Sequence, residues 1–209
     1  MPTSYNRIAG QSLHRLEALS DGVFAVAMTL LVLDLHAPAA AAIRSESDLW
    51  HALAALSPRL LTYLMSFVTL GIFWIGQQTQ HGLLQRSDRS YAWINLVFLM
   101  AVTLVPFSTA LLADFITYRI ALMIYWANIL VLGIAIAGAL YRARHFGLLK
   151  PEVPAEVYAA VVRRVALAQA LYAFGAALCV FSNWWSIAFI VTLQLIYAVA
   201  PRFRPFSWL

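Results

Sequence analysis

The chain has 209 residues, of which 63% are hydrophobic, 13% aromatic and only 11% charged, and its formal net charge is +5. A soluble domain carries about 25% charged residues, so this composition argues against a soluble enzyme, a disordered chain and a nucleic-acid-binding domain. A single cysteine, Cys179, allows neither an internal disulfide nor a thiolate metal site. The mean hydropathy of +0.78 indicates a polytopic membrane protein.

The first predicted helix, residues 15–35, has charged residues unusually close to its apolar centre. Glu17 and Asp21 precede the apolar stretch 22–33, and Asp34 follows it directly. Charged side chains are costly in lipid and usually face the interior of a helix bundle or water. We therefore expect this helix to face other helices or water rather than lipid all round.

Charge-free stretches predict the helices that follow. A helix needs about 20 mostly apolar residues to cross the hydrocarbon core of a bilayer. Stretches of this length predict three further spans, at 58–80, 90–113 and 119–141. Pro106 lies within the second of these three, and we expect it to kink that helix because proline has no backbone N–H.

The last charge-free stretch, 165–201, is too long for one span. The turn-prone pair Ser182-Asn183 divides it, which predicts helices at 164–182 and 184–201. The sequence therefore predicts an all-α fold with six transmembrane helices in a single domain, residues 1–209.

The cations are distributed unequally between the two sides of such a six-helix chain. Eleven of the 14 lie on the side of the two termini: Arg7, Arg15, Arg86, Arg89, Arg142, Arg144, Lys150, Arg163, Arg164, Arg202 and Arg204. Positive residues concentrate on the cytoplasmic side of membrane proteins. We therefore expect both termini in the cytoplasm, and the basic composition needs no nucleic-acid partner.

One face of the first helix is apolar with a single hydroxyl at its edge. At about 100° per residue, this face collects Gly22, Val26, Thr29, Leu30 and Leu33. An apolar stripe of this kind is usually core packing. Alternatively, several copies of the helix surround an axis and form a hydrophobic constriction that gates a pore.

The stretch RLEALSDGVFAVAMTLLVLDL, residues 15–35, resembles the first-helix signature of the transmembrane-protein-175 family of potassium channels. That signature has an arginine, three residues and then Phe-Ser-Asp; Arg15, Ser20 and Asp21 match it, whereas Leu19 replaces the phenylalanine. The similarity continues through 49–81 and 93–114 and covers nearly the whole chain. A tryptophan of the family's second helix corresponds to Trp74, and Gln77 and Gln78 stand where the family often has histidines.

This resemblance implies a potassium-permeable cation channel that assembles as a homotetramer in a prokaryotic plasma membrane. Its first helices would line a central pore, and the family's pore-lining positions correspond to Val26, Thr29 and Leu33. Leu30 is added by its place on the same helix face. Potassium ions, the lipid bilayer and other copies of the chain are the expected partners, and we expect no cofactor and no metal beyond the permeating ion.

Three further expectations concern individual side chains. By resemblance, Arg15, Ser20, Asp21 and Trp74 form a polar network that holds the pore helices in place, and the two glutamines alter its details. Val26 is smaller than the residue usual at its position, which predicts a wider constriction. Asp34 would lie at the outer mouth, where a ring of carboxylates attracts cations, or would be a solvated helix end.

Two other classes of function fit parts of the sequence. A secondary cation transporter usually shows an internal repeat or interrupted helices, and we find neither. A non-conducting membrane scaffold fits the composition equally well. An enzyme is not expected, because no known nucleophile or phosphate-binding motif is present; in-span polar residues such as Asn95, Asn128, Gln169 and Gln194 are typical of helix–helix contacts.

Overall fold

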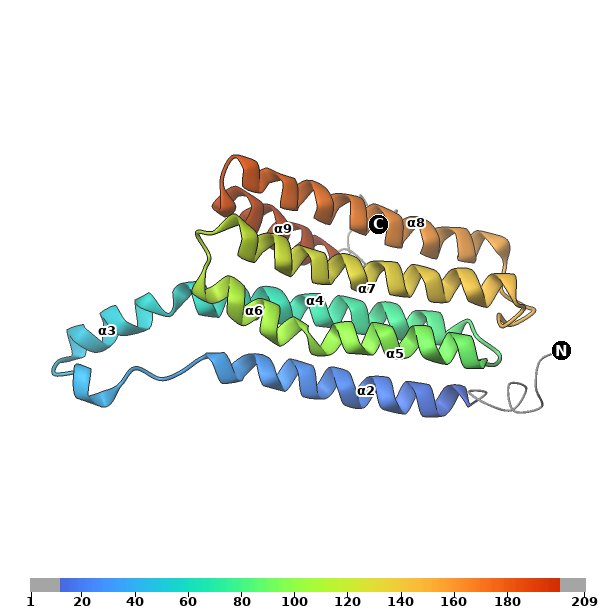
Figure 1. Cartoon of the computed structure of the whole chain (residues 1–209), viewed down its shortest axis with the longest axis horizontal. Coiled ribbons are helices and arrows are strands. Elements are labelled where there is room, and N and C mark those ends of the chain that lie inside the picture. The colour runs from blue at the N-terminus through green and yellow to red at the C-terminus, as the bar shows by residue number, and fades with distance from the viewer. Residues whose placement is uncertain (1–11, 200–209) are drawn as a thin grey trace.

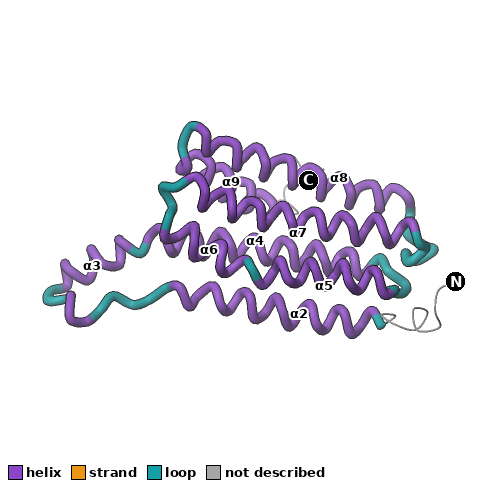
Figure 2. The backbone as a smooth tube through the Cα atoms, viewed as in Figure 1, coloured by secondary structure: helices purple, strands orange, loops and turns teal. Residues whose placement is uncertain are grey.

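The computed structural model describes residues 12–199, which form helices joined by loops (Figures 1 and 2). Within this range the only strand-like feature is an isolated backbone bridge between Leu84 and Leu149. The predicted all-α fold is therefore confirmed. In chain order the elements are α2 (Leu13–Leu30), η1 (Leu31–Asp34), η2 (Ala40–Ala42), α3 (Glu46–Ala55), α4 (Ser57–Gly82), α5 (Arg89–Thr103), α6 (Val105–Asp114), α7 (Arg119–His145), α8 (Ala155–Ala177), η3 (Leu178–Val180) and α9 (Asn183–Val199).

Five helical segments are long and apolar enough to cross a membrane. They are Leu13–Asp34, Ser57–Gly82, Arg89–Asp114, Arg119–His145 and Ala155–Val180. Helix α9 is also apolar but has only 17 residues in the described part of the chain. The chain is thus a multi-pass membrane protein, and a sixth span remains a prediction.

Two breaks in the helices follow from local sequence. Helix α5 ends at Thr103 and α6 begins at Val105, with Pro106 in its first turn. Proline fits the first turn of a helix but not its interior, so the kink expected at this residue is present. The second break lies between η3 and α9, where Asn183 starts α9 and donates from Nδ2 to the carbonyl of Ile116 over 3.0 Å.

The long helices run side by side along the longest axis of the molecule (Figure 1). Helix α2 packs against α4 and α5, α7 packs against α5, α6 and α8, and α8 packs against α9. In the view of Figure 1, α2 lies along one edge of the bundle and α8 along the opposite edge. Helix α3 projects beyond the end of the bundle and has no buried residue.

Buried hydroxyl and amide groups join four helices in the centre of the subunit. The Tyr125 hydroxyl lies 3.2 Å from both Ser66 Oγ and Thr69 Oγ1. Thr109 donates to Ser66 over 2.7 Å, and Gln194 donates to Thr69 over 2.6 Å. These contacts connect α4, α6, α7 and α9, and they satisfy polar groups that lipid would leave unpaired.

An ion pair fastens the beginning of α5 to the end of α7. Asp88 caps α5 by accepting from the Tyr91 N–H over 2.7 Å, and it accepts from Arg142 Nε and Nη2 over 3.1 and 2.7 Å. Burial raises the pKa of Asp88, but the hydrogen bonds from Arg142 and Tyr91 and the charge of Arg142 outweigh this effect. The pKa of Asp88 is therefore below its ordinary value, and the carboxylate is ionised at neutral pH.

Candidate functional site

Helix α2 has one face that belongs to the core of its own subunit. Ser20, Phe24, Ala27 and Leu31 are buried there. Their spacing of four, three and four residues is that of a single helix face. The rings of Phe24 and Phe98 lie 5.9 Å apart, so this face is packed against α5.

The opposite face of α2 is exposed over its whole membrane-spanning length. Val26 is 57% exposed, Leu30 43% and Leu33 64%, and Thr29 is also exposed. These are the four positions that the sequence predicted as pore-lining. None of them is buried against the described part of the same subunit, so this stripe is not core packing within one chain. It is available to lipid, to water or to another copy of the chain.

The Thr29 hydroxyl uses its proton within its own helix. Oγ1 lies 2.8 Å from the carbonyl oxygen of Val26 and 3.0 Å from that of Ala25, and it donates to them. A hydroxyl oxygen also has two acceptor lone pairs. Because the Thr29 proton is donated to the backbone, only the acceptor lone pairs of this oxygen are available on the exposed side of α2. Such an acceptor can interact with a cation.

Arg59 contacts the C-terminal end of the stripe. Its Nη1 donates to the carbonyl oxygen of Asp34 over 3.2 Å, and its Nη2 lies 2.6 Å from Asp114 Oδ1. The guanidinium therefore ties η1 to α6 through the backbone of Asp34 rather than through its carboxylate. Within residues 12–199, that carboxylate has no ion-pair partner, so its charge is not neutralised inside the subunit.

The structure joins two of the four residues assigned to the signature network by a hydrogen bond. The Trp74 indole N–H donates to Asp21 Oδ1 over 2.8 Å and joins α4 to α2. The neighbouring Ser20 donates to the Leu16 carbonyl over 2.8 Å and accepts from Asn95 Nδ2 over 3.3 Å. Arg15 makes no side-chain hydrogen bond or ion pair to these residues in the described part of the chain, and the role of all four residues in holding the pore helices stays a prediction.

Gln77 and Asn95 pair with each other beside Ser20, a pairing that the sequence did not predict. Gln77 is buried, and its Nε2 donates to Asn95 Oδ1 over 2.6 Å. Helices α2, α4 and α5 are thereby joined through Ser20, Asn95 and Gln77. The adjacent Gln78 is exposed and takes no part, and Leu19 is also largely exposed. The signals for the pair were the position of Gln77 where the family often has a histidine, and the presence of Asn95 as an amide within an apolar span.

The described residues contain no cluster of three or more histidine, cysteine, aspartate or glutamate side chains that could hold a metal ion. The α2 face is an apolar surface with one hydroxyl, that of Thr29, and a carboxylate at its end, that of Asp34. Such a surface can restrict or permit the passage of an ion.

Comparison with known families gives one match, over residues 15–106, to the model described as "Endosomal/lysosomal potassium channel TMEM175". A protein of Streptomyces collinus named as a potassium channel is 35% identical over 158 residues, which cover 73% of this chain and 75% of that protein. A protein of Chamaesiphon minutus, also named as a potassium channel, is 32% identical over 190 residues, which cover 88% of this chain and 93% of that one.

A solved structure with a similar fold is the crystal structure of a lysosomal potassium-selective channel TMEM175 homolog from Chamaesiphon minutus. It superimposes with a TM-score of 0.77 at 29% sequence identity. The alignment covers 91% of this chain and 98% of the other. The likeness therefore extends over the whole helix bundle, including the matched region that contains α2 and α4.

Proposed function

Because this chain belongs to the TMEM175 family, we propose that it is a potassium channel that conducts passively through a pore lined by the α2 helices of four copies. The observation that carries the proposal is the exposed face of α2. A helix with charged residues near both ends of its apolar centre is a poor lipid-facing helix. A central pore gives this face an environment that accepts both its apolar side chains and its polar edge.

In the proposed pore, Val26, Leu30 and Leu33 form successive apolar rings. Apolar constrictions control permeation by excluding water, so an ion must shed part of its hydration shell to pass. Potassium loses hydration water at lower cost than sodium, and the barrier therefore favours potassium. A ring of Thr29 oxygens next to the constriction replaces part of the lost water and strengthens this preference.

The other predicted residues support the pore from outside it. Four Asp34 carboxylates at the outer mouth raise the local concentration of cations. The contact between Trp74 and Asp21 fixes the rotation of α2, so that the apolar face points to the axis. We further propose six spans with both termini in the cytoplasm of a prokaryotic cell, as the distribution of cations predicts.

The proposal is tested by reconstituting the purified chain into liposomes loaded with potassium. A channel gives passive flux that follows the electrochemical gradient and does not saturate. A secondary transporter gives slow flux coupled to a second ion, and a scaffold gives none. Val26→Ile is expected to lower the conductance and Val26→Ala to raise it, relative to the exposed control Ile134→Ala on α7. Equal conductance in all three variants would contradict the proposed constriction.

A further inference from the structure

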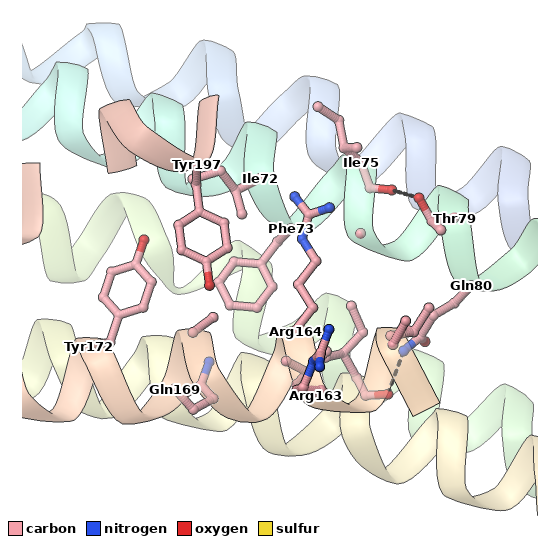
Figure 3. A pocket seen from close by; sticks show the side chains of 16 residues that line it. Ile72, Phe73, Ile75, Thr79, Gln80, Arg163, Arg164, Gln169, Tyr172 and Tyr197 are labelled. Atoms are coloured by element: carbon pink, nitrogen blue, oxygen red, sulfur yellow. Dashed lines mark hydrogen bonds between the residues drawn. The ribbon is translucent and has the colours of Figure 1, made fainter. Parts of the chain in front are cut away.

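A cavity of about 340 Å³ lies between α4, α7, α8 and α9, away from the exposed face of α2 (Figure 3). Its volume falls at the lower end of the range for small-molecule sites. Most of its wall is aliphatic or aromatic, with contributions from Ile72, Phe73, Ile136, Val165 and Ala168. The channel function proposed above does not use this cavity.

Two adjacent arginines give one side of this apolar cavity a strong positive charge. Arg163 and Arg164, both on α8, are exposed and line it. Neither makes an ion pair with a carboxylate of residues 12–199, and none of the described lining residues is acidic. The charge of the pair is therefore available to a ligand rather than to the protein.

Two buried polar groups in the same wall lack a partner. Tyr197 is only 6% exposed, and its hydroxyl makes no hydrogen bond with the described residues. The Gln169 Oε1 atom is also buried and makes no hydrogen bond with the described residues. The Tyr197 ring also lies 5.7 Å from the Arg164 guanidinium carbon, and Figure 3 shows these side chains around one space. Buried polar groups are nearly always hydrogen-bonded, and these two remain unpaired beside the cavity.

The position along α8 suits a lipid. The charge-free part of α8 begins at Val165, directly after the two arginines, so they lie where the helix enters the hydrocarbon core. Arginine at this depth extends its head group towards the interface while its stem stays in apolar surroundings. A phosphate at the interface and an acyl chain running towards Tyr172 match the two ends of the cavity.

We propose that this cavity binds an anionic phospholipid, with the phosphate held by Arg163 and Arg164 and part of an acyl chain in the apolar space. Basic pockets between transmembrane helices on the cytoplasmic side are suited to anionic head groups. The segment after Val199 carries Arg202 and Arg204, so its charge would be repelled by the same arginines. Charge complementarity thus favours the lipid over this segment of the chain.

The test is native mass spectrometry of the full-length protein with phosphatidylglycerol and phosphatidylcholine of identical acyl chains. Each arginine near an anionic head group contributes a factor of about five in binding. The double variant Arg163→Gln with Arg164→Gln should therefore lose roughly 25-fold in phosphatidylglycerol binding. Ala168→Phe, which fills the apolar part, should also weaken binding. Arg144→Gln, which lies outside the cavity against Tyr158, should leave it unchanged.

Several results would overturn the proposal. They are equal retention of the two lipids by the unaltered protein, retention of neither lipid, or equal loss in the Arg144→Gln control. Displacement of the lipid by millimolar inorganic phosphate would show that only the phosphate is recognised and would contradict the acyl-chain part. Ala168→Phe leaves both arginines in place, so it should reduce phosphatidylglycerol binding even if the double arginine variant fails to fold.

Discussion

The rotation of α2 about its own axis depends on a small number of side-chain contacts. The Trp74 indole N–H donates to Asp21 Oδ1 over 2.8 Å, and Asn95 Nδ2 donates to Ser20 Oγ over 3.3 Å. Ser20 lies on the buried face of α2 and Asp21 lies outside the exposed stripe. Because these contacts connect to α4 and α5, they act together with the buried Phe24 to turn the stripe away from the subunit.

Asp21→Asn is expected to weaken assembly before it changes ion preference. The substitution keeps an acceptor for Trp74 but removes its charge, and a neutral hydrogen bond is about half as strong as a charge-assisted one. We expect a lower yield of tetramer in size-exclusion chromatography and an unchanged ratio of potassium to sodium permeability in the remaining channels. A normal tetramer yield with an altered permeability ratio would show that Asp21 acts on the ion directly.

Gln77 and Gln78 are adjacent residues, but their replacement by alanine is expected to change the free energy of unfolding by different amounts. Gln77→Ala leaves the buried Asn95 oxygen without its donor, and an unsatisfied buried group costs about 1–3 kcal/mol. Gln78 is exposed, so Gln78→Ala should change the free energy of unfolding by less than about 0.5 kcal/mol. Thermal unfolding in detergent compares the two variants directly. Equal destabilisation would show that the hydrogen bond of Gln77 does not contribute to stability.

At the scale of helices, α8 packs closely against α9 at Gly175. A Cβ atom there would lie 2.8 Å from Phe189 Cδ1 and 3.0 Å from Ile190 Cγ1. Gly175→Ala should therefore destabilise the protein by about 1–3 kcal/mol through overpacking. Gly138→Ala on α7 has no atom within 4 Å of the new Cβ and should be neutral or slightly stabilising in a thermal melt. If both alanine variants melted alike, the close approach of α8 and α9 would be wrong.

The ion pair between α5 and α7 predicts a pH dependence of stability. The pKa of Asp88 is lowered in the folded state. The ionised carboxylate therefore contributes to the free energy of unfolding at neutral pH, and this contribution is lost as the pH falls through the lowered pKa. Asp88→Asn keeps the helix cap and removes the charge, which should cost about 1 kcal/mol at pH 7. The melting-temperature difference from the unaltered protein should shrink below about pH 4. A difference that stays constant from pH 7 to pH 3 would exclude this ion pair as its source.

Charge-free stretches predicted the spans, although α8 begins at Ala155 rather than at 164, whereas the partners of the helices could not be predicted. Pro106 and the pair Ser182-Asn183 marked both interruptions, because a missing N–H and a turn-prone pair act locally. The pairing of Gln77 with Asn95 depends on how α4 and α5 are rotated against each other, which no local pattern contains. The cavity beside Arg163 and Arg164 was missed for the same reason, since four separate helices form its wall.

For the whole molecule, the central claim is that α2 presents its exposed face to a shared, water-filled path. Lipid is the alternative environment for an exposed face of a membrane-spanning helix, and the two environments differ in access to water. Val26 and Ile134 lie on different helices with similar exposure, 57% and 61%. They therefore provide a matched pair, one expected in the pore and the other in lipid.

The most direct test is block of potassium current by a charged, water-soluble thiol reagent after cysteine substitution, in a Cys179→Ser background. We predict that Val26→Cys channels lose most of their current on exposure to the reagent, and that Ile134→Cys channels do not. Current through Val26→Cys channels that is insensitive to the reagent, while Ile134→Cys channels are blocked, would contradict the account.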